Sequence, residues 1–170
     1  NGSYVKKDID KANHFFALFE NQIDLDAQKK LGIIYYEGKY VTQDINKAIH
    51  YFTHAQNQND SEVQFYLGMS YINNQYDKRD ANKAIQYLKL SANQNNTFAQ
   101  FHLGICYLEG EYVERDIDKT INYLTLAANK NHPKAQYNLG AIFAKGEYVK
   151  RDITKAIHYF LLAANQNDID

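Results

Sequence analysis

This 170-residue sequence has no tryptophan, one methionine, one proline and one cysteine. Because Cys106 has no partner cysteine within the sequence, an internal disulfide and a cysteine metal cluster are both excluded. The single proline, Pro133, leaves long stretches free to form helices. An excess of one charge is also lacking, since 19 basic and 20 acidic residues give a formal net charge of -1. Lysine and arginine are scattered, so we expect neither a nucleic-acid partner nor an anionic membrane partner.

Long apolar runs are absent as well. No stretch of about 18 apolar residues could span a bilayer, and the opening "NGSYVKKDID" lacks the apolar core of a secretory signal. The overall content of 45% apolar and 23% charged residues is ordinary for a folded globular chain. We therefore expect a domain with a real core and no membrane span.

The sequence does contain an internal repeat of 36 residues. The dipeptide Leu-Gly begins at positions 31, 67, 103 and 139, without insertions between copies. Aspartate, lysine and ring series keep the same period, and in one copy they are represented by Asp116, Lys119 and Tyr123. Such a period is typical of a repeat architecture, which has to be recognised before any motif is interpreted.

A second glycine series, Gly2, Gly38, Gly110 and Gly146, also follows this period, with Asn74 in the remaining copy. A phosphate-binding glycine loop occurs once per site and follows a strand, so a series present in every copy does not fit it. Asparagine is the residue other than glycine that best tolerates positive φ. The series therefore predicts left-handed joints at helix C-termini.

The glycines of the Leu-Gly series lie inside predicted helices, where each costs roughly 1 kcal/mol relative to alanine. Because this loss of helix stability recurs at Gly32, Gly68, Gly104 and Gly140, a structural feature present in every copy must favour glycine there. We expect close approach of a neighbouring helix, with a large ring such as Tyr123 or Tyr159 packing against the exposed backbone.

Apolar spacing between the joints follows the helical period, as at Ile117, Ile121, Leu124 and Ala128. Asp116 stands at an N-cap position, and Pro133 suits a first helical turn. The pattern predicts a first helix in each copy at 25–37, 61–73, 97–109 and 133–145, and a second at 8–20, 44–57, 80–93, 116–129 and 152–165. Short connections make each pair antiparallel, and one hairpin cannot bury both its faces. The predicted fold is an all-α solenoid of stacked helix pairs.

The string "AQFHLGICYLEGEYVERDIDKTINYLTLAANKN" at 99–131 closely resembles the Sel-one-like repeat, a relative of the tetratricopeptide repeat. The matching positions are Ala99, Leu103, Gly104, Tyr107, Gly110, Val113, Asp116, Lys119, Tyr123, Ala127 and Ala128. Thr120, Asp77 and Ala81 depart from the pattern. The resemblance implies a right-handed superhelix that acts as an adaptor for other proteins, as in bacterial host-interaction proteins. It implies no catalysis and no cofactor.

We expect residues 1–170 to form one array, with a partial repeat at 1–24 and repeats at 25–60, 61–96, 97–132 and 133–168. Phe160, Leu161 and Leu162 have no following helix to cover them. Terminal repeats normally have a polar outer face. The sequence is therefore expected to be a piece of a longer protein, or to have lost C-terminal residues.

By the resemblance, the first helices line a concave surface, and their largely apolar rows are the predicted binding site for a protein or peptide. The predicted contact residues are Ile33, Tyr36, Phe65, Met69, Ile72, Phe101, His102, Ile105, Leu108 and Tyr137. An alternative interpretation is that these side chains only pack between adjacent repeats.

The sequence also allows three further interpretations of the function. Cys106 and His102 lie one helical turn apart, which suits a thiol nucleophile, but the equivalent slots hold Ile34, Ser70 and Ile142, so a buried hydrophobic role fits better. His50 and His54 form a similar pair without a third metal ligand, so no metal site and no small-molecule substrate are expected. The array could also be a structural spacer, with binding located in other parts of a larger protein.

Overall fold

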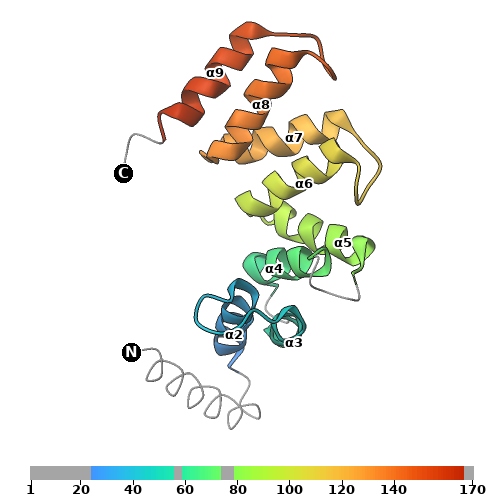
Figure 1. Ribbon diagram of the computed structural model, residues 1–170, viewed down its shortest axis with the longest axis vertical. Helices are drawn as coiled ribbons and strands as arrows, with labels where there is room; N and C mark the ends of the chain where they lie inside the picture. The colour runs from blue at the N-terminus through green and yellow to red at the C-terminus, as the bar shows by residue number, and fades with distance from the viewer. Residues whose placement is uncertain (1–23, 56–58, 74–78, 167–170) are drawn as a thin grey trace.

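The computed structural model describes residues 24–55, 59–73 and 79–166. Over these residues the chain forms eight helices and no strand (Figure 1). The helices are α2 (Leu25–Glu37), α3 (Ile45–Ala55), α4 (Ser61–Tyr71), α5 (Ala81–Asn93), α6 (Thr97–Glu109), α7 (Ile117–Ala128), α8 (Pro133–Lys145) and α9 (Ile153–Ala164). The all-α prediction is confirmed. The helix expected at 8–20 lies outside the described residues, and α4 ends two residues before the predicted limit.

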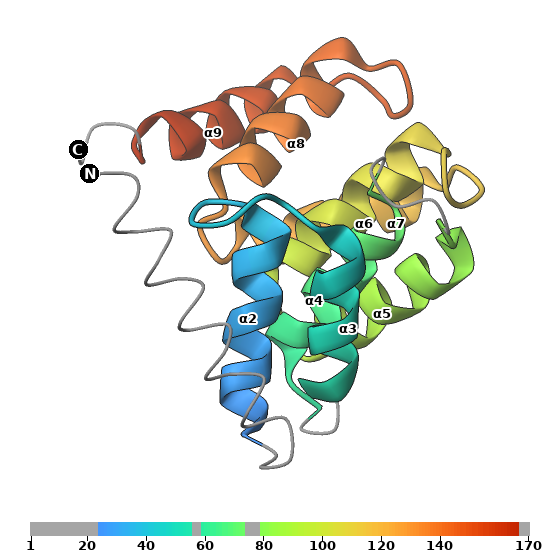
Figure 2. The same ribbon diagram turned by 60° about the horizontal axis from the view of Figure 1, so that its bottom comes forward.

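Helices pack in pairs, α2 with α3, α4 with α5, α6 with α7 and α8 with α9, and the second helix of each pair contacts the first helix of the next. Figures 1 and 2 show the pairs in chain order along the molecule, from α2 and α3 at one end to α8 and α9 at the other. This arrangement is the predicted α-solenoid.

The hydrophobic core lies within the pairs and also between them. Leu88 and Ala92 of α5 share a buried cluster with Ala99 and Leu103 of α6. In the same way, the α7 side chains join those of α8 in a second buried cluster. Because each cluster includes two repeats, a single pair would leave one apolar side uncovered.

The predicted N-cap at Asp116 and the predicted left-handed glycine joints are confirmed at every described position. Asp116 is the N-cap of α7, and its carboxylate accepts a hydrogen bond from the Lys119 N–H at 2.9 Å. Gly38, Gly110 and Gly146 end their helices in the left-handed region, with φ of 67°, 72° and 67°. Gly2 and Asn74 lie outside the described residues. The other connections also contain left-handed residues, which the sequence analysis missed: Asn59, Asn95 and Asn131.

The aspartate, lysine and ring series form one structural unit in each hairpin. Lys119 Nζ lies 2.7 Å from an Asp116 carboxylate oxygen and 5.0 Å from the centre of the Tyr107 ring. That ring stacks on Tyr123 of the second helix, with centres 5.9 Å apart. The same arrangement recurs with Lys47 at Tyr35, Lys83 at Tyr71 and Lys155 at Phe143. Cation–π and ring contacts thus add to the joint between the two helices of each pair.

Close helix approach at the internal glycines is confirmed, but the predicted neighbours are wrong. A Cβ added at Gly104 would lie 2.8 Å from Leu124 side-chain atoms, and one at Gly140 would lie 2.7 Å from Phe160. The contacting residues are one position later than Tyr123 and Tyr159. These tyrosines stack instead on Tyr107 and Phe143, one turn beyond the glycines.

Gly104→Ala is expected to lower the free energy of unfolding by about 1–3 kcal/mol, because the new methyl group overlaps Leu124. Intrinsic helix propensity alone would change stability in the opposite direction by about 1 kcal/mol. Urea unfolding of Gly104→Ala, Leu124→Ala and the double variant measures the coupling. The overlap predicts that the double variant is more stable than the sum of the single effects. Additive effects would contradict it.

A buried glutamine recurs near the start of the first helix in successive repeats, and its hydrogen bonds were not predicted from the sequence. Gln64, Gln100 and Gln136 follow an alanine or valine at the start of each first helix, and all three are buried. Gln94 Nε2 donates to Gln64 Oε1 at 2.8 Å, and Gln166 Nε2 donates to Gln136 Oε1 at 2.6 Å.

The third repeat breaks this series. Position 130 holds lysine where the equivalent positions hold Gln94 and Gln166. Lys130 Nζ donates to the Asn95 carbonyl at 2.6 Å, and the buried Gln100 Oε1 has no hydrogen-bond partner. A buried acceptor without a partner costs about 1–3 kcal/mol.

Lys130→Gln is therefore expected to raise the free energy of unfolding by about 1 kcal/mol, because the new amide can donate to Gln100. Chemical unfolding of this variant and of Lys89→Gln, at an exposed site on α5, checks the prediction. Equal stability of the two variants would show that Gln100 gains nothing from residue 130.

Candidate interaction surface

The first helices of successive repeats meet through aromatic contacts. Tyr36 of α2 and Tyr66 of α4 have ring centres 5.2 Å apart in an edge-to-face arrangement. Phe65 of α4 lies 5.7 Å from the ring of His102 on α6. Phe101 stacks on His132, the N-cap residue of α8, at 4.5 Å. These rings form an almost continuous row along the first helices.

The predicted contact residues lie in this row, and most of them are only partly accessible. Ile33 and Tyr36 pack against the buried cluster that contains Phe52. Phe65 and Met69 pack on the α5–α6 cluster, whereas Phe101, Ile105 and Leu108 pack on the α7–α8 cluster. Ile72 and His102 are also half-buried. Tyr137 is 59% exposed. The row therefore contributes to packing between repeats and also leaves apolar surface accessible.

A cleft of about 1280 Å³ opens at the C-terminal part of this row. It lies between the first turns of α6 and α8, with the α7–α8 connection beside it and the end of α9 forming one wall. Aromatic rings and cationic or imidazole side chains line it together: Phe98, Phe101, His102, His132, Lys134 and Tyr137. Phe101, His102 and Tyr137 were predicted contact residues. Phe98, His132, Lys134 and Lys130 were missed, although each departs from the residues at equivalent repeat positions.

Both imidazoles in the cleft are neutral at neutral pH. The His102 ring lies between Phe65 and Phe101, and burial lowers its pKa to about 4, with the nearby His132 and Lys134 acting in the same direction. Burial, followed by the charge of Lys134, also lowers the pKa of His132. Its Nδ1 accepts a hydrogen bond from the Ala135 N–H at 3.2 Å, so this ring caps α8.

The geometry does not support a thiol nucleophile at Cys106. This cysteine is buried, and burial raises the pKa of its thiol to about 11, with a smaller contribution from Glu109 and Glu111. A catalytic cysteine requires the opposite shift, because the thiolate is the reactive form. Cys106 is thus protonated at neutral pH and packs as a small hydrophobic residue.

The histidine pair on α3 is also weak as a metal site. The ring centres of His50 and His54 are 4.5 Å apart, and both residues are exposed. In the described parts of the chain, no group of three or more histidine, cysteine or acidic residues could hold a metal ion.

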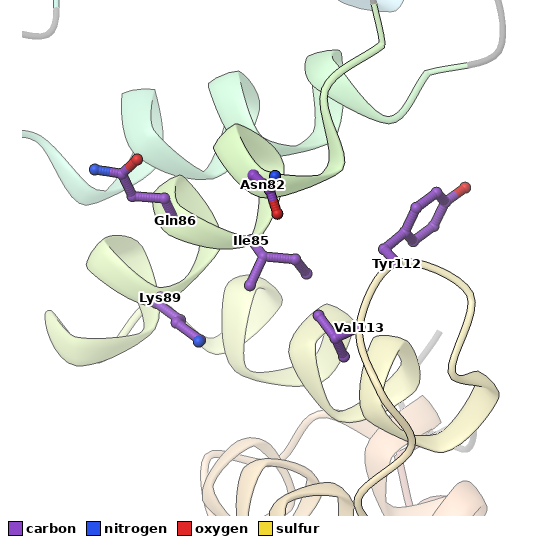
Figure 3. Close-up of a pocket in the computed structure, with 6 residues that line it drawn as sticks. All are labelled: Asn82, Ile85, Gln86, Lys89, Tyr112 and Val113. Atoms are coloured by element: carbon purple, nitrogen blue, oxygen red, sulfur yellow. The ribbon is translucent and has the colours of Figure 1, made fainter.

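A second, smaller depression of about 490 Å³ lies between α5 and the connection that follows α6 (Figure 3). Ile85 and Lys89 of α5 face Tyr112 and Val113 of the connection. Tyr112 and Val113 pack on the cluster that contains Ile85, and burial raises the pKa of the Tyr112 hydroxyl. This depression lies at the contact between two consecutive repeats. Its lining brings together no group of like charges.

Stacked helix pairs with a row of aromatic and aliphatic side chains along their first helices define a repeat protein of the α-solenoid class. The chain belongs to the Sel1 repeat family, which it matches over residues 1–21, 25–60, 61–96, 97–132 and 133–168. Proteins of this family are typically non-catalytic interaction scaffolds. No helix in the described ranges is long and apolar enough to cross a membrane.

Solved structures with the same fold include c5321 of uropathogenic Escherichia coli, a protective antigen. It is 26% identical with a TM-score of 0.76, over 98% of this chain and 33% of that one. A Sel1 repeat protein of Oxalobacter formigenes is 23% identical with a TM-score of 0.79, over 99% and 71% of the two chains. Cysteine-rich protein B of Helicobacter pylori is 26% identical with a TM-score of 0.56, over 75% and 92%. The present chain thus spans about a third of the c5321 chain. A comparison with curated proteins gives no match.

His102 is expected to make stability depend on pH between about 4 and about 6.5. In this interval the unfolded chain binds a proton at the imidazole and the folded chain does not, so acid favours unfolding. From about pH 7.5 to about pH 5, this group is expected to remove on the order of 2 kcal/mol of stability.

Urea unfolding across this range checks the expectation with His102→Asn, which introduces the residue found at the equivalent position 138. That variant should lose less stability in acid than the unaltered chain. His158→Asn, at an exposed site, is the control and should keep the original pH dependence. Equal slopes for all three proteins would contradict the assignment to His102.

Proposed function

We propose that this chain is a non-catalytic scaffold that binds a partner peptide or protein domain along the row formed by α2, α4, α6 and α8. The observation that carries the proposal is the exposure of large rings beside half-buried ones in this row. Phe98 and Tyr137 are each 59% exposed, next to the half-buried Phe65 and Phe101. Contiguous accessible apolar surface of this kind suits a helical or extended segment laid in a groove.

The Sel1 repeat family supports the scaffold part of the proposal, because its members typically mediate protein–protein interaction. The similarity to c5321, a protective antigen of uropathogenic Escherichia coli, suggests a setting in bacterial host interaction. This setting is the finer part of the proposal.

The half-burial of the row favours a second candidate, in which its side chains only hold successive repeats together and the array is a spacer. Phe65 illustrates the ambiguity, since it contacts Phe98 and His102 of the next repeat at ring-centre distances of 5.9 and 5.7 Å. A spacer would need these contacts for its shape and would bind no partner along the row.

Affinity capture from host-cell and bacterial lysates separates the two candidates. The double variant Phe65→Ser/Phe101→Ser is expected to lose a partner that the unaltered chain captures repeatedly, because it removes two rings from the centre of the row. Leu90→Ser/Leu126→Ser, at exposed positions on α5 and α7, is the matched control and should keep the partner. Circular dichroism verifies that both variants remain helical. Capture that is equal for the row variant and the unaltered chain would exclude the groove.

A further inference from the structure

The first turns of the first helices change charge along the array. The N-cap positions hold Asp24, Asp60, Asn96 and His132, in chain order. The second helical positions hold Asp26, Glu62, Phe98 and Lys134. The array is therefore acidic at α2 and α4, neutral at α6 and basic at α8. The acidic end is partly neutralised, because Lys29 Nζ lies 2.9 Å from Asp60 and 3.1 Å from Glu62 carboxylate oxygens.

Two basic residues that line the cleft, Lys130 and Lys134, occupy positions where lysine lowers local stability. Negative charge stabilises a helix N-terminus and positive charge destabilises it by about 0.3–1 kcal/mol, so Lys134 in the first turn of α8 is unfavourable there. Lys130 replaces the glutamine that would satisfy the buried Gln100 Oε1. Residues that lower local stability are expected at sites where function, rather than stability, has selected them.

Both lysines line the same cleft, together with the two imidazoles. Among the described residues that line this cleft, none is aspartate or glutamate. The positive charge of Lys134 acts inside the cleft, because it contributes to the lowered pKa of both His102 and His132. The cleft is thus electropositive, although the whole chain has a net charge of -1.

The floor of the cleft is aromatic. Phe98 is 59% exposed although repeats are present on both sides of it, and its ring centre lies 5.9 Å from Phe65 and 5.6 Å from His132. An exposed ring between packed rings can receive a further apolar side chain by edge or face contact. Lys130 and Lys134 are exposed and line the same cleft, so they can meet carboxylates that flank this side chain.

From these observations we infer that the cleft between α6 and α8 binds an acidic segment of a partner protein, in which an aromatic or branched aliphatic side chain lies beside carboxylates. That side chain contacts the Phe98 ring, and the carboxylates meet Lys130 and Lys134. This inference rests on the proposed scaffold function and adds the chemistry of the segment that the scaffold holds.

The test uses the full chain, isotope-labelled for two-dimensional NMR, and three peptides that share the phenylalanine and leucine but differ in net charge at the other three positions: acetyl-DFDDL-amide, acetyl-NFNNL-amide and acetyl-KFKKL-amide. The acidic peptide is expected to shift the resonances of Phe98, His102 and residues 130–134 at submillimolar concentration. The basic peptide should not shift them. Equal binding of the acidic and basic peptides would overturn the inference.

A second test replaces the two lysines with residues that other repeats of this chain hold at the equivalent positions. Lys130→Gln with Lys134→Glu restores the residues found at the equivalent Gln94 and Glu62, and both changes are expected to preserve or raise stability. Binding of the acidic peptide should weaken by at least about tenfold in this variant. Lys89→Gln with Lys150→Glu, at exposed positions outside the cleft, is the control and should leave the affinity unchanged. An equal loss in both variants would overturn the inference as a general charge effect.

Three other outcomes separate this inference from the proposed function. Shifts confined to Ile33, Met69 and Ile72 would support a binding row and overturn the cleft as its acidic subsite. Stronger binding of oligo-dT or of phosphatidylserine vesicles than of the acidic peptide, with loss in the Lys130/Lys134 variant, would assign the cleft to phosphate groups and overturn the inference. A cleft that responds to none of the peptides would also overturn it, while partner capture by the row still tests the scaffold.

Discussion

The two helices of each pair cannot bury all of their apolar side chains against each other, and the next pair covers the side chains that remain. Leu103 of α6, for example, is buried because α5 and α7 approach it from neighbouring positions in the stack. The close fit at Gly104 brings the Leu124 side chain within van der Waals reach of the helix backbone. Since each repeat rests on the one before it, a constant period of 36 residues is a physical requirement. An insertion would move every later contact out of register.

Capping residues and other polar contacts recur with the same period, and they define where the helices of each pair begin and end. Aspartate caps, left-handed glycine and asparagine joints and the lysine contacts to stacked rings recur in the described repeats. The glutamine series differs from these features because its amide hydrogen bonds join the first helix of a repeat to the end of the second helix of the same repeat. A departure in one repeat is therefore informative, since three other copies show what the fold alone would place there. Lys130, His132 and Lys134 are such departures, and they gather at one cleft.

The row of rings along the first helices has two physical consequences at once. Phe65 and Phe101 hold neighbouring repeats together, and Phe98 extends the same aromatic contacts to the surface. A partner that binds there would continue a packing mode that the protein already uses internally. Burial beside Phe65 and Phe101 also lowers the pKa of the His102 imidazole, and burial in the α5–α6 cluster raises the pKa of the Cys106 thiol on the same helix.

The sequence by itself determined the helices, their caps, the repeat length and the solenoid, because these depend on local periodicity and on residues within one copy. Tertiary structure decided which side chains meet between helices. Tyr123 was expected at Gly104 but stacks on Tyr107, because the two helices are offset by one residue in a way that the period alone does not reveal. The unpaired Gln100 oxygen and the electropositive cleft likewise depend on distances between segments that are far apart in the sequence. The repeating pattern specifies which residues lie in the same row along successive helices. How exposed each residue is, and which charges surround it, depends on the helix that packs beside it.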